Sequence, residues 1–297
     1  MKKDIPIYDI AHLTKDDLVV SRFAPYLETH KNLCLPHKHN FYHFLLFTKG
    51  GGSHMIDFKQ FPVQPYQMYF MIPGQVHSWN FEGEVDGYVI NFPVPFFKEF
   101  LLNPDYIEQF PYFSGVLENA VITLPQELRE NVRHILENIL KEMEADNRQS
   151  LDMVKVLLMQ LFITIGRLGF ENPAVKLTSH NYLLARNFLR LLEQHVGTLK
   201  LPKEYAELLF ITPNHLNAVC NEILGRSAGE VIRDRVVLEA KRLMVNKELS
   251  ISEIAYKLNF SDNSYFSKFF SKYAGMTAEA FRNSAFMQSL DSRYPSK

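Results

Sequence analysis

Residues Ile251–Arg282 read ISEIAYKLNFSDNSYFSKFFSKYAGMTAEAFR, and their pattern decides the fold of the C-terminal part of the chain. Ser250, directly before this stretch, and Glu253 have the spacing of a capping box at the start of a helix. Ser261 is expected to cap the helix that follows. Apolar residues of that second helix recur at helical spacing and are expected to face a core: Phe266, Phe269 and Phe270. The stretch therefore predicts two short helices joined by a tight turn.

The same design occurs once earlier, in KEYAELLFITPNHLNAVCNEILG, Lys203–Gly225. Thr212 is placed to cap the second helix, and Pro213 suits its first position because the missing N–H has no partner to lose there. Three apolar residues at i, i+3 and i+4 turn this helix toward a core: Leu216, Val219 and Cys220. The repeat predicts two helix-turn-helix units, at about residues 203–224 and 250–273.

One long helix is expected between the two units. Ser227 and Glu230 form another capping box, and apolar residues recur at helical spacing from Val231 to Val245. The basic residues on its outward face are candidates for phosphate contact, but most are expected to be simply solvated: Arg233, Arg235, Lys241 and Arg242.

Residues 251–282 resemble the signature of the AraC/XylS family of bacterial transcription regulators, and the resemblance extends from about His180 to Asn283. It implies a domain that places two recognition helices in successive major grooves of DNA. Helical periodicity leaves polar or small side chains outward in each unit, where they are suited to bases or phosphates: Asn214, Asn217, Ala218 and Asn221 in the first, and Asn263, Ser264, Ser267 and Lys268 in the second. All of these except Asn221 fall on base-facing positions of the family.

The chain departs from the family pattern at three positions of these units. Phe210 and Asn259 stand in the tight turns, where the family usually has glycine. Asparagine tolerates the left-handed conformation, but a phenylalanine is strained there, so the first turn is expected to differ in shape. Ala218 stands where a longer, basic side chain is frequent. The first unit is therefore expected to read fewer bases and to depend more on DNA shape.

The formal net charge of −1 is unevenly distributed along the chain. Residues 1–179 carry 16 lysines and arginines against 21 aspartates and glutamates, whereas the remaining residues carry 16 against 12. Binding of phosphates requires a local positive potential rather than a positive net charge. The basic excess of the C-terminal part is thus compatible with a nucleic-acid partner.

The N-terminal half has a different sequence pattern. Short apolar runs broken by glycine and proline predict strands and tight turns from about Asp17 to Phe97. Two helices should follow, at about Pro125–Ala145 and Leu151–Leu168, which either cover the core of this domain or pair with a second copy of the chain. The predicted organisation is a first domain at 1–170, a linker at 171–179, a DNA-binding domain at 180–287 and a tail at 288–297.

Four histidines stand out in this half. LPHKHNFYHFLLF and MIPGQVHSWNF contribute His37, His39, His43 and His77, in the spacings HxHxxxH and PGxxH. These spacings resemble the two motifs of the cupin barrel, whose His, His, Glu and His converge on a metal, with His43 in the glutamate position. Neutral imidazoles are ligands for zinc, iron, copper and nickel.

A second interpretation of these histidines is favoured. AraC/XylS regulators commonly carry a cupin-like sensor and keep histidines near these positions as pocket or core residues, so no cofactor is expected. Aromatic residues are expected around the same site: Phe41, Tyr42, Phe44, Phe70, Trp79 and Phe81. The family includes sugar-responsive members, but nothing in these residues selects a carbohydrate as the effector.

Together these patterns predict an α+β multidomain chain with a cupin-like β-barrel and flanking helices at the N-terminus and an all-α domain with two helix-turn-helix units at the C-terminus. We expect a sequence-specific transcription regulator rather than an enzyme, with double-stranded DNA and a small-molecule effector as partners and RNA polymerase and a second copy as further candidates. Two alternatives stay open: a metal-dependent cupin enzyme fused to a DNA-binding domain, and a DNA-binding protein controlled by its abundance alone.

The location and redox chemistry follow from what the sequence lacks. The N-terminus MKKDIPIYDI has no apolar signal-peptide core, and no stretch reaches the ~18 apolar residues of a membrane span, so a cytoplasmic protein is expected. Cys34 and Cys220 are far apart and form no CxxC pair, so both are expected to be inert packing residues.

Overall fold

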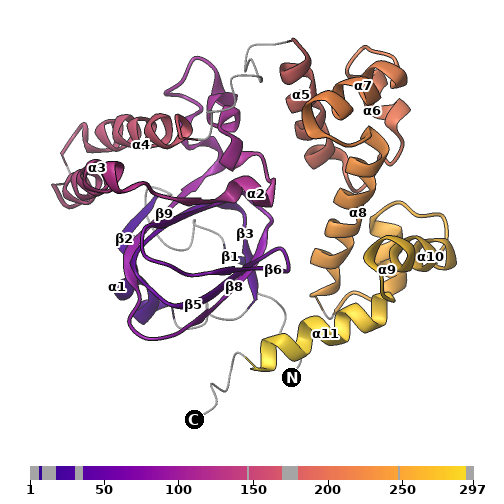
Figure 1. The fold of residues 1–297 in the computed structure, drawn as a ribbon, viewed down its shortest axis with the longest axis horizontal. Coiled ribbons are helices and arrows are strands. Elements are labelled where there is room, and N and C mark those ends of the chain that lie inside the picture. Colours follow the sequence, from indigo (N-terminus) through magenta and orange to yellow (C-terminus); the bar gives the residue numbers. More distant parts are fainter. Residues whose placement is uncertain are drawn as a thin grey trace. The chain divides into compact units, whose positions relative to one another are not determined.

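The computed structural model describes residues 7–8, 18–30, 36–145, 147–168, 180–246 and 248–291. Contacts divide the chain into one unit at Ile5–Glu171 and another that contains Asn172–Lys297. The predicted linker at 171–179 and Cys34 lie outside the described residues. Each unit is described by itself below (Figure 1).

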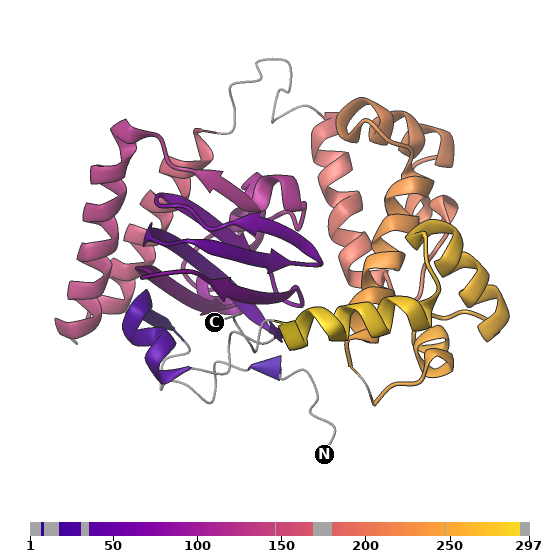
Figure 2. The ribbon, with the colours of Figure 1, turned by 60° about the horizontal axis from the view of Figure 1, so that its bottom comes forward.

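The N-terminal unit contains two five-stranded sheets (Figure 2). One has the strand order β1 (Ile7–Tyr8), β3 (His37–His39), β8 (Val76–Phe81), β5 (Gly52–Ile56) and β6 (Lys59–Pro62). The other has the order β10 (Val121–Thr123), β7 (Gln67–Met71), β4 (Phe41–Lys49), β9 (Asp86–Pro93) and β2 (Val19–Arg22). Only β1 and β3 pair in parallel among the described strands; the other pairs are antiparallel.

Strand β4 is buried on both of its faces. One face, with His43, Leu45 and Phe47, lies toward the sheet that contains β8. The alternate residues point the other way, into a core shared with helices: Tyr42, Phe44 and Leu46. A strand covered on both sides has apolar residues on both faces, and in Phe41–Phe47 only His43 interrupts the apolar run.

Helices cover the outer face of the second sheet. Helix α3 (Gln126–Ala145) and helix α4 (Ser150–Gly166) pack on each other and on the strands, close to their predicted positions. Shorter helical elements lead into them: η3 (Val94–Phe97), η4 (Pro104–Gln109), η5 (Pro111–Phe113) and α2 (Leu117–Ala120). Burial of the apolar stripes of α3 and α4 stabilises this layer, at about 25 cal/mol per Å² of apolar surface.

The aromatic residues expected around one site are divided between these two faces. Tyr42, Phe44 and Phe70 belong to the core under the helices, so their predicted place beside the histidines is wrong. Phe41 and Trp79 do contact histidine rings, and Phe81 packs with Trp79. Helix α1 (Phe23–Thr29) adds Phe23 to this interior cluster, against Trp79 and Phe81.

The second unit is all helical. Its described helices are α5 (His180–His195), α6 (Pro202–Leu208), α7 (Pro213–Leu224), α8 (Ala228–Met244), α9 (Ile251–Lys257), α10 (Asn263–Ala274) and α11 (Ala278–Asp291). Helices α6 and α7 form the first helix-turn-helix unit, α9 and α10 form the second, and α8 joins them (Figure 1). Helix α11 continues past residue 287, where the domain was predicted to end.

Side-chain caps fix where these helices begin. Ser227 with Glu230, and Ser250 with Glu253, form the predicted capping boxes. Thr212 Oγ1 accepts a hydrogen bond from the backbone N–H of His215 at 3.2 Å, as predicted.

The cap of α10 is one residue later than predicted. The backbone of Asp262 is extended, and its Oδ1 accepts from the N–H of Tyr265 at 2.7 Å. A carboxylate forms a charge-assisted bond to these N–H groups, and its negative charge suits a helix N-terminus. Asp262 rather than Ser261 is therefore the cap.

The two tight turns have the same backbone form. Phe210 has φ 56° and Asn259 has φ 54°, both left-handed. In each unit the residue after this position donates its N–H to a carbonyl five residues back, from Ile211 to Ala206 and from Phe260 to Ala255, at 3.0 Å in both. The expected difference in turn shape is thus wrong, and Phe210 holds a conformation that usually favours glycine, with a side chain 95% exposed.

Candidate nucleic-acid interface and sensor site

The outward face of α7 carries three of the four residues predicted for it. Asn214, Ala218 and Asn221 are exposed. Asn217 is half-buried, and its Oδ1 accepts from the N–H of Ala228 at 3.0 Å, the first residue of α8. This contact makes Asn217 a structural link between α7 and α8, a role that the spacing within one helix did not indicate.

The outward face of α10 carries Ser264 and Lys268, both exposed, and the half-buried Ser267. Asn263 is also half-buried, and its Oδ1 has no hydrogen-bond partner among the described residues. Tyr265, the next residue after Ser264 in α10, was not predicted for this face, but its side chain is 59% exposed.

The two helices can be compared residue by residue because their caps, Thr212 and Asp262, are 50 positions apart. Ala218 then corresponds to Lys268, and Glu222 corresponds to Lys272. The carboxylate of Glu222 accepts from Asn181 Nδ2 at 2.8 Å. The α10 face is therefore the more positive of the two, which suits phosphate contact.

A further exposed pair was missed by sequence reasoning. His215 on α7 and Tyr265 on α10 occupy equivalent third helical positions, counted from the two caps, and both are exposed. The equal distance from the two caps was the available signal. Both side chains offer polar groups beside the predicted reading positions.

Two of the four basic residues predicted on the outward face of α8, Arg235 and Arg242, are less solvated than predicted. Arg233 and Lys241 are half-buried. Arg235 forms two hydrogen bonds to the carboxylate of Glu193, at 2.6 and 2.8 Å, and one to Glu239 at 2.9 Å. Arg242 is buried, 3.7 Å from Glu239. These arginines hold the helical unit together, because bidentate carboxylate pairs fix both partners.

In the N-terminal unit, strand pairing brings the four predicted histidines together. His37 lies opposite His77 in the register of β3 and β8, and His39 follows on the same face of β3. His43 reaches the group from β4 of the other sheet, with ring centroids 5.1 Å from His39 and 5.4 Å from His77. All four side chains are buried.

A fifth histidine belongs to the same cluster. His54 of β5 is buried, and its Nε2 lies 3.1 Å from His77 Nδ1. Sequence reasoning missed His54 because it stands in neither histidine motif. The signal was the two-residue alternation of β5, which turns His54 and Ile56 to the same buried face.

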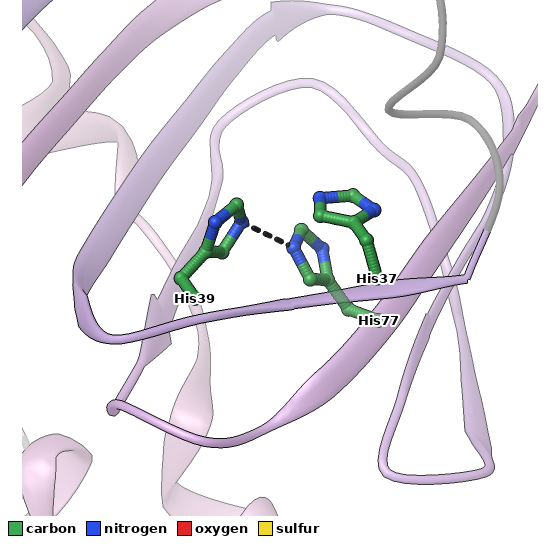
Figure 3. Close-up of side chains that lie close together, drawn as sticks. All are labelled: His37, His39 and His77. Atoms are coloured by element: carbon green, nitrogen blue, oxygen red, sulfur yellow. Dashed lines mark hydrogen bonds between the residues drawn. The ribbon is translucent and has the colours of Figure 1, made fainter. Parts of the chain in front are cut away.

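Hydrogen bonds orient the imidazoles. His77 Nε2 lies 2.7 Å from His39 Nε2, as Figure 3 shows together with His37. His43 Nδ1 lies 2.5 Å from Asn91 Oδ1, and Asn91 Nδ2 donates to Tyr26 Oη at 3.2 Å. With this amide orientation the His43 proton is on Nδ1, which leaves a lone pair on Nε2.

Burial favours the neutral form of four of these histidines, His39, His43, His54 and His77. It lowers the pKa of His39, His54 and His77 well below 6.5, and the neighbouring imidazoles lower it further. Burial also lowers the pKa of His43 to about 3, although the hydrogen bond to Asn91 acts in the opposite direction. Neutral imidazoles carry free lone pairs and can act as metal ligands or as hydrogen-bonding groups toward a bound molecule.

A strand-built domain with a buried polar cluster, followed by two helix-turn-helix units, defines a one-component transcription regulator with a sensor and a DNA-binding domain. Residues 24–162 match the family model of the AraC-like ligand binding domain, and residues 205–284 match that of the helix-turn-helix domain. The chain belongs to the AraC family of transcription regulators. In the described residues, no helix is both long and apolar enough to cross a membrane.

Two transcriptional activators resemble the chain over most of its length. The HTH-type transcriptional activator RhaR of Enterobacter sp. (strain 638) is 20% identical over 255 residues, which cover 85% of this chain and 88% of the relative. RhaR of Yersinia pseudotuberculosis serotype O:1b is 21% identical over 278 residues, 91% of this chain and 93% of the relative. Neither name describes an enzyme.

Among solved structures, unsaturated fatty acid bound ToxT from Vibrio cholerae is 13% identical with a TM-score of 0.43, covering 95% of this chain and 97% of that one. A transcriptional regulator with an AraC-type DNA-binding domain from Chromobacterium violaceum is 16% identical with a TM-score of 0.32. It covers 35% of this chain and 92% of that chain.

Proposed function

We propose that the chain activates transcription from the cytoplasm by binding two successive major grooves of its operator, under the control of a small molecule held by the N-terminal domain. The observation that carries the proposal is the repeated, similarly capped pair α6–α7 and α9–α10, with the same left-handed turn in each. The name of RhaR, a transcriptional activator of similar length, supports activation.

The two recognition helices would have unequal tasks. On α10, Lys268 and Ser264 are exposed and suited to phosphates and base edges, with Asn263 and Ser267 beside them. On α7, Asn214 and Asn221 offer amides that can pair with adenine, while Ala218 offers only a methyl group. We assign most of the base discrimination to α10 and the positioning on DNA to α7.

A homodimer is part of the proposal. Leu151, Met153 and Val156 on α4 are apolar and exposed, at 36%, 46% and 48%. Apolar side chains left exposed together on one helix support an interface between copies of the chain. The molar mass in solution, measured by light scattering, should be that of a dimer, and Val156→Glu should shift it toward that of a monomer.

The effector proposal is tested by a thermal-shift screen of sugars, aromatic acids and metal ions, each followed by a DNA-binding assay. A true effector raises the melting temperature by mass action and changes the affinity for operator DNA. Binding of DNA that no compound alters would leave regulation by abundance as the better account.

RNA polymerase is the partner proposed for activation. Transcription from the operator-bearing promoter in a purified system should rise when the chain and its effector are both added. A fall in transcript level under the same conditions would make the chain a repressor.

A further inference from the structure

Five buried imidazoles meet in the interior of the N-terminal unit, contributed by β3, β8 and β5 of one sheet and by β4 of the other. One nitrogen from each of His37, His39 and His77 lies within 4.8 Å of the other two. Figure 3 shows these three rings gathered on one side of β3 and β8. So many polar rings in an apolar interior are costly unless their nitrogens have partners.

The nitrogens of this cluster are incompletely satisfied by the protein. His43 Nε2 and His54 Nδ1 are buried and have no hydrogen-bond partner among the described residues. The bond from His43 Nδ1 to Asn91 leaves the lone pair of Nε2 on the nitrogen that makes no such bond. A buried acceptor such as His43 Nε2 calls for a partner, which a water or an ion can supply.

The pair of Nε2 atoms on His39 and His77 is compatible with an ion in the same place. At 2.7 Å, the two neutral rings share a single proton, or both can give their lone pairs to one cation. His54 then has a distinct task. In the tautomer with the His54 proton on Nδ1, its Nε2 accepts from His77 Nδ1. This bond holds the His77 proton on Nδ1 and leaves the lone pair of His77 Nε2 for an ion.

We propose that this cluster binds one divalent first-row transition-metal ion, with His37, His39 and His77 as ligands and His54 as the residue that positions His77. His43 lies beside these three rings but outside the group of three ligand nitrogens. An all-imidazole donor set suits zinc, copper, nickel, cobalt or iron rather than magnesium or calcium, which require oxygen ligands. When bound, the ion would cross-link β3 and β8 and supply a Lewis-acidic centre. The site goes beyond the proposed function, since binding of DNA does not require it.

The surroundings favour retention of an ion. The Trp79 ring lies 5.1 Å from His77 and 5.8 Å from His37 between ring centroids, and the Phe41 ring lies 4.3 Å from His39. These aromatic rings form an apolar shell that limits the access of water to the histidine nitrogens.

The test uses the full chain with its purification tag removed. The protein is stripped with a chelator, dialysed separately against Zn²⁺ and Co²⁺, and assayed by elemental analysis, thermal melting and, for Co²⁺, visible absorption. We expect one ion per chain, a higher melting temperature and the absorption of a nitrogen-ligated cobalt ion. Less than one tenth of an ion per chain, with no change in melting, would overturn the proposal.

Variants separate the roles within the cluster. His37→Ala and His39→Asn should lose the stoichiometric ion, whereas His134→Ala, on the exposed surface of α3, should retain it. His54→Gln should still bind one ion, with affinity reduced about 10–100-fold, as expected for an outer partner. Each variant is first shown to be folded, by a cooperative melt of its apoprotein in the chelator. If a variant is not folded, the proposal is judged on the metal content of the wild type alone.

Operator binding is measured on the same samples. A chain that binds DNA but no metal overturns the metal site and leaves the proposed function standing. A chain that binds one ion but no DNA overturns the proposed function and leaves the metal site standing. Loss of the ion in His134→Ala, or its retention in both His37→Ala and His39→Asn, would show that the metal binds elsewhere.

Discussion

At the scale of single residues, the recognition helices differ most where Ala218 corresponds to Lys268. The ammonium group of Lys268 is exposed, and a lysine contact to phosphate contributes similarly whatever the base sequence. We expect Lys268→Ala to weaken operator binding uniformly across sequences and to reduce its dependence on salt by about one unit of slope. Titrations at several salt concentrations measure both.

The reciprocal change is the matched control for Lys268. Ala218→Lys introduces a cation at the equivalent position of α7 and should strengthen binding and steepen the salt dependence. If both variants bind DNA like the wild type at every salt concentration, the predicted DNA-binding faces of α7 and α10 are wrong.

The turn residue Phe210 offers a test of backbone strain. A left-handed conformation costs a residue with a Cβ about 1–2 kcal/mol, while asparagine adopts it readily. Because the Phe210 side chain is almost fully exposed, its removal loses little packing. We expect Phe210→Asn to raise the free energy of unfolding by about 1 kcal/mol, measured by urea denaturation.

Asn259→Phe makes the opposite exchange in the second unit. It introduces the strain and removes the hydrogen bond from Asn259 Nδ2 to the carbonyl of Thr198, 3.0 Å long. This variant should be less stable than the wild type. A stability loss in Phe210→Asn instead would mean that the exposed ring makes a contact worth more than the strain.

At the scale of elements, the contact from Asn217 to the start of α8 links the first unit to the long helix. Asn217→Ala removes an acceptor from the first N–H of that helix, which costs about 1 kcal/mol. Asn221→Ala is the matched control, because Asn221 is exposed on α7 like the rest of its outward face. It makes the same Asn-to-Ala gain in helix propensity but removes no hydrogen bond to α8. We expect Asn217→Ala to be the less stable of the two in urea denaturation.

Equal stability of these two variants would contradict the structural role of Asn217 and return it to the set of base-reading residues. In that case, Asn217→Ala should instead change the preferred base at one operator position, which a binding-site selection detects.

The elements themselves were largely predictable, for local reasons. Capping boxes such as Ser250 with Glu253 and apolar spacing within one helix depend only on neighbouring residues. Contacts between elements were not predictable in this way. The bond from Asn217 to Ala228 and the place of His54 depend on how α8 and β5 pack, and β4 gives no alternating pattern because both its faces are buried.

At the scale of the whole molecule, charge is separated along the chain, with the acidic excess before residue 180 and the basic excess after it. Association with DNA is steered by local potential, and acidic regions of the same chain oppose non-specific binding. We therefore expect the chain to bind random-sequence DNA weakly at physiological salt and its operator much more tightly. Competition titration with unrelated DNA measures this ratio.

Tight binding to random-sequence DNA at physiological salt would contradict this expectation. The control is the same titration with an unrelated DNA-binding protein of basic net charge. As the salt concentration is lowered, the ratio of its affinities for specific and random-sequence DNA should fall before that of this chain does.

Strand β4 gives the sensor domain a mechanical property. Its successive residues face alternately the histidine cluster, through His43, and the core beneath α3 and α4, through Tyr42 and Phe44. A close-packed strand cannot yield on one side only, because neighbouring side chains share one backbone. A molecule or ion that shifts the β4 backbone at His43 would shift Tyr42 and Phe44 as well, so β4 couples the histidine cluster to the core beneath the helices.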